Sequence, residues 1–212
     1  MFHSIVIFGD SITQGAFDAE SGGWVSRLAA FVYGKEKADR TGDTTIVFNL
    51  GISGESSVRM KERFQTELSH RVEYTDKVTV VIDMGGNDAG VEIATGKNHV
   101  EIADYIANMR HCIRHAKEKG YGVVCLGLGS YDESRTDPIL WDKENAARNS
   151  EAARYDDALK VLAGEEEALY IPTRDLFATR PELLLDGDHP NSEGHKLIFE
   201  RVKEYLEKAS IL

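Results

Sequence analysis

Cysteine is scarce in this chain, which has only Cys112 and Cys125 among its 212 residues. Two cysteines are too few for the disulfide framework that holds small secreted domains together, so we expect both thiols to be reduced and the protein to be cytoplasmic. The first ten residues, MFHSIVIFGD, agree with this location, because they lack the basic region and the small-residue cleavage site of a signal peptide.

Positive charge is scarce as well, with 25 Lys and Arg against 36 Asp and Glu and a formal net charge of −11. An acidic chain repels the phosphate backbone, and no basic cluster offsets this average, so we do not expect a nucleic-acid partner. No apolar run approaches the ~20 residues that a membrane-spanning helix needs. The composition, with 42% hydrophobic and 29% charged residues, is typical of a soluble globular protein, and the length predicts one domain over residues 1–212.

Short apolar segments rich in β-branched residues recur along the chain and predict buried strands. They lie at 3–8, 44–50, 77–84, 121–128 and 168–171. Helical patterns lie between and after them, at 23–38, 99–120, 144–163 and 191–209. Near-continuous apolar strands indicate a parallel sheet with both faces covered. The order of these elements therefore predicts an α/β fold, a three-layer αβα sandwich.

Two connections, 85–98 and 129–143, are longer than a parallel sheet requires. Ligands of open α/β sheets bind outside the carboxyl ends of the strands, so long loops at that edge are candidate walls of a pocket. Four polar segments fall at the same edge. They are GDS at 9–11, NLGISG at 49–54, GGND at 85–88 and DGDHPN at 186–191.

Together these segments supply the groups that acyl transfer to a serine requires. Ser11 offers a hydroxyl at a strand-to-helix turn, and His189 offers an imidazole that can take its proton. Asp186 precedes His189 by three residues, close enough to bond the imidazole N–H. The Ser11 N–H, the Gly51 N–H and the Asn87 amide are candidate donors to an oxyanion, and losing one such donor typically costs ~2.7–4 kcal/mol of transition-state stabilisation.

The same four segments, in this order, resemble the sequence blocks of the SGNH (GDSL-type) hydrolase family, and they span residues 9–190. The resemblance implies a flavodoxin-like, five-stranded parallel sheet with strand order 2-1-3-4-5. It also implies a catalytic triad of Ser11, His189 and Asp186 and an oxyanion hole of Ser11, Gly51 and Asn87. The first block continues with Ile12 where the eponymous motif has Leu, which changes no reacting group.

A serine hydrolase of this kind cleaves carboxylic esters and needs neither a metal nor an organic cofactor. We expect a small-molecule ester as substrate, with small soluble, O-acetyl or short-acyl esters favoured. Lysophospholipase and acyl-thioesterase activities occur in the same family and stay open. Trp141, in the long connection after the fourth strand, is a candidate substrate-binding residue, although an anchor for its own loop is an equal alternative.

Other interpretations stay open for single residues. Ser11 alone would be a common helix N-cap, and Ser53 and His195 are a rival nucleophile and a rival base. His111 and His115 have the i, i+4 spacing of zinc ligands but lack a third ligand at a suitable spacing. A different class of function is a non-catalytic, flavodoxin-like binding module, which would hold a phosphate or a flavin at the turn after the first strand.

Overall fold

The computed structural model describes residues 1–39, 42 and 44–212. At its centre lies a parallel sheet with the strand order β2-β1-β3-β6-β8. The strands are β1 (Phe2–Gly9), β2 (Thr44–Gly51), β3 (Lys77–Asp83), β6 (Gly122–Leu126) and β8 (Leu169–Ile171). Because β6 and β8 are the fourth and fifth strands of this sheet in chain order, the predicted order 2-1-3-4-5 is confirmed.

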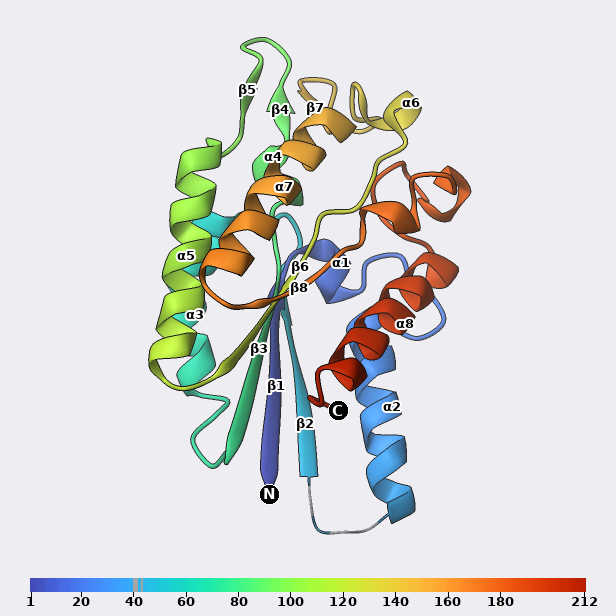
Figure 1. Cartoon of the computed structure of the whole chain (residues 1–212). Coiled ribbons are helices and arrows are strands. Elements are labelled where there is room, and N and C mark those ends of the chain that lie inside the picture. The colour runs from blue at the N-terminus through green and yellow to red at the C-terminus, as the bar shows by residue number, and fades with distance from the viewer. Residues whose placement is uncertain (40–41, 43) are drawn as a thin grey trace.

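The three neighbouring strands β2, β1 and β3 end at one level (Figure 1). Gly9, the last residue of β1, is paired with Gly51 of β2 and with Asp83 of β3. Polar segments that follow these strands therefore begin at a common edge, which is the carboxyl edge where ligands of such sheets bind.

Five long helices cover the two faces of the sheet (Figure 1). They are α2 (Trp24–Asp39), α3 (Ser57–Ser69), α5 (Ile102–Glu118), α7 (Asn149–Glu165) and α8 (Ser192–Lys208). One hydrophobic cluster joins the sheet to α3, α5 and α7, and a second joins it to α2 and α8. The predicted three-layer αβα sandwich is therefore confirmed.

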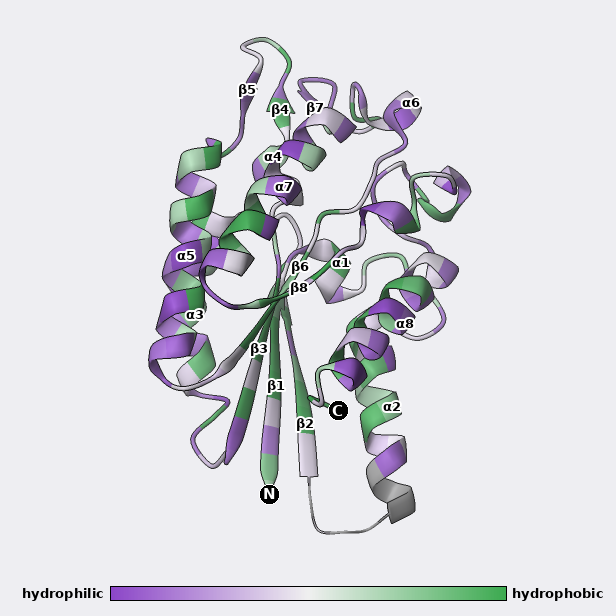
Figure 2. Ribbon diagram, in the orientation of Figure 1, coloured by the Kyte–Doolittle hydropathy of each residue, from purple (hydrophilic) through white to green (hydrophobic). Residues whose placement is uncertain are grey.

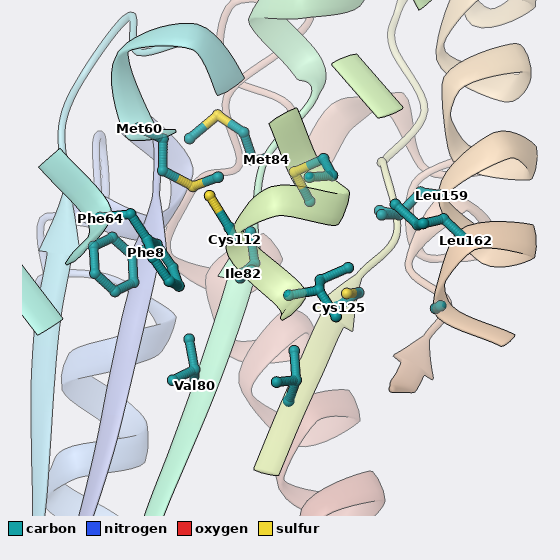
Figure 3. Packing of buried hydrophobic residues seen from close by; sticks show 14 of the residues in the cluster. Phe8, Met60, Phe64, Val80, Ile82, Met84, Cys112, Cys125, Leu159 and Leu162 are labelled. Carbon is teal, nitrogen blue, oxygen red and sulfur yellow. The ribbon is translucent and has the colours of Figure 1, made fainter. Parts of the chain in front are cut away.

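Alternate residues of β1 point into the two layers, as the pleat of a strand requires. Val6 and Phe8 belong to the cluster with α3, α5 and α7, whereas Ile5 and Ile7 belong to the cluster with α2 and α8. The ring of Phe8 packs against Phe64 of α3 with 4.5 Å between the centroids (Figure 3). Figure 2 shows hydrophobic residues along much of the strands and a mixture of hydrophobic and hydrophilic residues along the helices. Burial on both faces explains why the strands are almost continuously apolar.

The two long connections form short elements above the carboxyl edge (Figure 1). The first connection holds α4 (Gly86–Ala89), β4 (Val91–Glu92) and β5 (Lys97–Asn98), and the second holds α6 (Glu133–Thr136). Strand β7 (Asn145–Ala146) follows directly after the second connection. Strands β5, β4 and β7 form a small antiparallel sheet. The predicted helix at 144–163 is wrong at its start, because pairing of Ala146 with Val91 holds this segment extended and α7 begins only at Asn149.

Three further short helices complete the edge. The four-residue helix α1 (Ser11–Gln14) follows β1, and the 3₁₀ helices η1 (Arg174–Leu176) and η2 (Pro181–Leu183) lie between β8 and α8. No helix in residues 1–39, 42 and 44–212 has the length and apolar character needed to cross a membrane. Cys112 and Cys125 are free and buried (Figure 3).

Candidate active site

Ser11 is positioned by the turn at the end of β1. Asp10 caps the following helix, because its Oδ1 accepts a hydrogen bond from the Ile12 N–H at 3.0 Å. Gly9 is needed for the close approach of this turn, since a Cβ at that position would lie 2.1 Å from Thr13 Oγ1. Ser11 is only 6% exposed and borders a pocket at the carboxyl edge. The capping interpretation of Ser11 is wrong, because Asp10 performs that role.

His189 reaches Ser11 from the loop before α8. The Ser11 hydroxyl donates a hydrogen bond to His189 Nε2 at 2.8 Å, although the two residues are 178 positions apart in the chain. The His189 Nδ1–H donates to Asp186 Oδ2, also at 2.8 Å. A hydroxyl, an imidazole and a carboxylate are thus connected in one line, which is the arrangement that activates a serine.

The charges around His189 favour its protonated form. Burial lowers the pKa of His189, but the hydrogen bond to Asp186 and the charges of Asp188, Asp186 and Asp10 outweigh it, so the net pKa is raised. The pKa of Asp186 is shifted in the opposite direction. Burial raises its pKa, but hydrogen bonds from the His189 ring and from the backbone N–H groups of His189 and Asp188 hold the net pKa below its usual range. The pair is therefore suited to hold an imidazolium beside a carboxylate.

Arg135 of α6 fixes the loop that carries His189. Its guanidinium donates to the carbonyl oxygens of Leu184 at 2.7 Å and Leu185 at 3.0 Å, and its Nε donates to Asp132 Oδ2 at 2.7 Å. The Asp132 N–H in turn donates to the carbonyl of Gly187 at 2.8 Å. The sequence analysis missed Arg135 because its loop partners are backbone carbonyls, which leave no trace in a residue pattern.

Gly51 does not offer its N–H to this pocket. That N–H donates to Asn49 Oδ1 at 2.9 Å, whereas the N–H of the next residue, Ile52, donates to Gly9 of β1. In a parallel pair, backbone N–H groups point alternately toward and away from the partner strand, so the Gly51 N–H points away from β1 and Ser11. The geometry gives Gly51 a steric role instead, because a Cβ there would lie 2.3 Å from Gln14 N.

Asn87 lies in α4, beside the loop that follows β2. Its Nδ2 donates to the carbonyl of Glu55 at 3.0 Å and to Asp10 Oδ2 at 3.4 Å. The first contact has ordinary hydrogen-bond length, whereas the second is long. One amide hydrogen of Asn87 is therefore held only weakly and can turn to another acceptor.

The loop between β2 and α3 is fixed by a buried ion pair. The Glu55 carboxylate is paired with the Arg63 guanidinium, with 2.8 Å between Arg63 Nε and Glu55 Oε1. Arg63 also donates to the carbonyl of Leu50, at the end of β2. Gly54 lies within this loop with a φ of +72°, and its N–H meets no hydrogen-bond acceptor in the described residues. The sequence analysis assigned no role to Gly54.

A small pocket, with a cavity volume of about 60 Å³, opens beside Ser11. Its wall includes the carboxyl groups of Asp10, Asp83 and Asp188 and the ring of Tyr131. Burial raises the pKa of Asp10 and of Asp188, and it raises the pKa of Asp83 to about 6. Burial and the nearby carboxylates also raise the pKa of Tyr131 well above its usual range. The pocket is therefore small, and its wall combines these polar groups with apolar side chains.

Trp141 lies at the mouth of the site. Its ring is 59% exposed, and its centroid is 6.2 Å from that of the His189 ring.

The rival base and the rival nucleophile lie in other surroundings. His195 is fully buried, and its Nε2 donates to the carbonyl of Ala16 at 2.9 Å, away from Ser11. Ser53 is exposed, and in the described part of the chain no base is bonded to its hydroxyl.

The helix that carries His111 and His115 offers no metal site. His115 packs edge-on against the ring of Phe64, with 6.1 Å between the centroids. Across the described ranges, no group of three or more His, Cys, Asp or Glu residues is arranged to hold a metal ion.

Comparisons with known proteins identify similar sequences. The family model described as "GDSL-like Lipase/Acylhydrolase family" matches residues 7–197. The isoamyl acetate-hydrolyzing esterase of Saccharomyces cerevisiae is 25% identical, over 97% of this chain and 87% of the yeast protein. A GDSL esterase/lipase of Arabidopsis thaliana is 26% identical, over 97% of this chain and 86% of the plant protein.

Solved structures share the fold. The acetylxylan esterase of Geobacillus stearothermophilus has a TM-score of 0.70 at 22% identity, over 96% of this chain and 93% of that chain. An α/β hydrolase enzyme from the metagenome of Lake Arreo has a TM-score of 0.73 at 21% identity, over 95% of this chain and 94% of that chain. Structures described as catalytic mutants of the acetylxylan esterase replace a serine, a histidine or an aspartate by alanine.

Proposed function

The chain belongs to the GDSL-like lipase/acylhydrolase family and is a carboxylic ester hydrolase, and we propose that Ser11, His189 and Asp186 are its catalytic triad. The observation that carries this assignment is the line of two hydrogen bonds, each 2.8 Å long, from the Ser11 hydroxyl through the His189 ring to Asp186. The family's solved relative supports it, because catalytic mutants of the acetylxylan esterase exchange the same three residue types.

The reaction proceeds in two halves. His189 Nε2 takes the Ser11 proton as Oγ attacks the ester carbonyl, and Asp186 stabilises the imidazolium that forms. The imidazolium then protonates the leaving alcohol, which departs and leaves an acyl group on Ser11. Water, activated by the same imidazole, attacks the acyl carbon, and the acid leaves as the Ser11 hydroxyl is restored.

We assign the oxyanion to three donors. The Ser11 N–H stands at the first position of α1, where a helical N–H has no partner within the helix. The second donor is the Asn87 amide, which gives up its long contact with Asp10. The third is the Gly54 N–H, in place of Gly51, because the Gly51 N–H is engaged by Asn49. Each donor is expected to stabilise the transition state by ~2.7–4 kcal/mol.

We propose short-acyl esters, acetates above all, as substrates. The pocket beside Ser11 has room for a small group only, about 60 Å³. The named activities of the yeast and Geobacillus relatives are also on acetate esters.

We further propose that residues 1–212 form one domain, because both hydrophobic clusters share the five-stranded sheet. A cytoplasmic location is proposed from the two free, buried cysteines.

The test is a series of p-nitrophenyl esters from acetate to long acyl chains. We expect the wild type to prefer the shortest esters, and Ser11→Ala to lose roughly 10³-fold or more in kcat/KM, because the nucleophile is gone. Ser53→Ala is the matched control, since this exposed serine has no base beside it, and it should keep wild-type activity. A fluorophosphonate should label the wild type and Ser53→Ala but not Ser11→Ala. Labelling that persists in Ser11→Ala would exclude Ser11 as the nucleophile.

A further inference from the structure

On the basis of the proposed esterase function, we propose that Phe17 and Trp141 form an aromatic clamp over His189 that binds the alcohol part of the ester and selects apolar alcohols. The clamp is made of two half-exposed rings, Phe17 at 52% and Trp141 at 59% exposure. They come from different segments, the loop between α1 and α2 and the connection between β6 and α7.

Both rings face the same imidazole. The Phe17 and His189 ring centroids lie 5.2 Å apart with 75° between the planes, and the Trp141 and His189 centroids lie 6.2 Å apart with 38° between the planes. The leaving alcohol must lie within hydrogen-bond reach of His189, because that ring protonates its oxygen. Side chains that flank the imidazole therefore contact the alcohol part of the ester.

The backbone at Phe17 supports a functional role for its ring. Phe17 has a φ of +64°, a left-handed conformation that bulky side chains rarely adopt. Burial does not compensate this strain, because half of the ring is exposed to solvent. A strained residue with an exposed apolar side chain at an active site is best explained by what that side chain binds.

The residues on each side of Phe17 hold it in this conformation. The Asp18 carboxylate accepts hydrogen bonds from the backbone N–H groups of Glu20, Ser21 and Gly23, and its Oδ2 also accepts from Arg27 Nε at 3.2 Å. On the other side, the carbonyl of Ala16 accepts a hydrogen bond from the buried His195. These contacts fix both neighbours, so the Phe17 ring stays beside His189 without a core of its own.

The two parts of the ester meet different surroundings. The pocket beside Ser11 and Asn87, where the acyl group of a bound ester lies, is small and has room for a short group only. The clamp, in contrast, offers two aromatic faces open to solvent, and apolar groups gain free energy by covering them. The structure therefore points to esters that join a short acyl group to a larger alkyl or aryl alcohol.

The experiment compares acetates that differ only in their alcohol: methyl, 2-hydroxyethyl, hexyl and 2-phenylethyl acetate. Phe17→Gly removes the ring and suits a positive φ, whereas Phe17→Asn suits this φ and adds a polar group. We expect Phe17→Gly and Trp141→Ala each to lower kcat/KM about tenfold or more for hexyl and 2-phenylethyl acetate, and less than about threefold for methyl and 2-hydroxyethyl acetate. Phe17→Asn should behave like Phe17→Gly.

The loss should appear mainly in KM, since the clamp binds the alcohol part in both the ground state and the transition state. Thermal unfolding provides a second readout, in which Phe17→Gly should melt at or above the wild-type temperature because backbone strain is relieved. Tyr74→Ala is the control, since this ring is 84% exposed in the turn before β3, at the opposite edge of the sheet. It should leave all four acetates unchanged.

Equal losses on all four acetates would overturn the clamp and make the two rings supports of His189 alone. Unchanged preferences in both clamp variants would overturn it as well. The failure of the proposed function looks different, because the wild type would then hydrolyse none of the four acetates. In that case the clamp falls together with the esterase assignment.

Discussion

Two groups of carboxyl side chains flank His189, and their environments differ. On one side, Asp186 accepts hydrogen bonds from the His189 ring and from two backbone N–H groups, and its pKa lies below the usual range. On the other side, Asp10, Asp83 and Asp188 line the pocket beside Ser11, and burial raises the pKa of each. Burial raises the pKa in both groups, and it prevails at the three pocket carboxyl groups, whereas hydrogen bonds outweigh it at Asp186.

The number of donors aimed at each carboxyl group differs in the same sense. Asp186 has three donors, whereas Asp83 has the Thr13 hydroxyl at 2.7 Å and Asp10 has the Ile12 N–H and the long contact from Asn87. Donors stabilise the charged form of a carboxyl group, and desolvation opposes it. One residue type thus supplies a carboxyl group with a lowered pKa behind the imidazole and carboxyl groups with raised pKa values at the pocket.

The sharpest test of this difference is to neutralise Asp186. Asp186→Asn should lower kcat/KM roughly 10³–10⁴-fold, because an amide neither stabilises the imidazolium nor holds the ring in the reactive tautomer. Asp188→Asn, two residues further along the same loop, should stay within about fivefold of the wild type. The measurement is kcat/KM on p-nitrophenyl acetate at neutral pH. Similar losses in the two variants would show that the carboxyl groups are not divided as we describe.

The pocket carboxyl groups should lower the stability of the fold. The pKa of Asp83 is raised from 3.8 to about 6 in the folded protein, so the native state binds a proton more tightly than the unfolded chain. Stability is therefore lost as the pH rises from about 4 to about 6. We expect Asp83→Asn to raise the free energy of unfolding at pH 7 by about 1–2 kcal/mol, less than the ~3 kcal/mol of the full shift, because Asp83 is only partly buried.

Urea unfolding at pH 4 and pH 7 measures this effect. The gain of Asp83→Asn over the wild type should be present at pH 7 and nearly absent at pH 4. Asp104→Asn, at an exposed position of α5, is the control and should show the same small difference at both values. A variant less stable than the wild type at pH 7 would mean that Asp83 contributes to stability through Thr13 more than its burial costs.

The sequence predicts the fold well because its signals are local. The strands stand out as apolar runs, since both of their faces are buried. The helix α3 was not among the predicted segments, although Met60, Phe64 and Leu68 stand at helical spacing in its sequence. The start of α7 was wrong because Asn145–Ala146 pairs with β4, and this tertiary contact overrides the helical pattern.

The site is predicted only where the chemistry depends on residue type. Ser11, His189 and Asp186 were proposed because a triad needs those side chains, and the structure joins the three side chains by hydrogen bonds. Gly51 was given a donor role that its geometry contradicts, because the direction of a backbone N–H depends on strand pairing. Phe17 was not singled out, because the role that we propose for it depends on a backbone angle and a ring contact that no residue pattern encodes.

The smallest expected effect concerns the charge of Asp188. Burial lowers the pKa of His189, and the hydrogen bond to Asp186 together with the charges of Asp188, Asp186 and Asp10 raises it overall. His189 acts as a base only when it is neutral, so kcat/KM rises with pH through its pKa. Asp188→Asn removes one of the raising charges, so the acid limb of the profile should move to lower pH, and kcat/KM at pH 5 should exceed that of the wild type about two- to threefold. The control is Glu193→Gln, which changes an exposed carboxylate early in α8 and should leave the acid limb of the pH profile in place. A limb that stays in place or moves to higher pH in Asp188→Asn would show that this carboxyl group holds its proton throughout and acts only as a wall of the pocket.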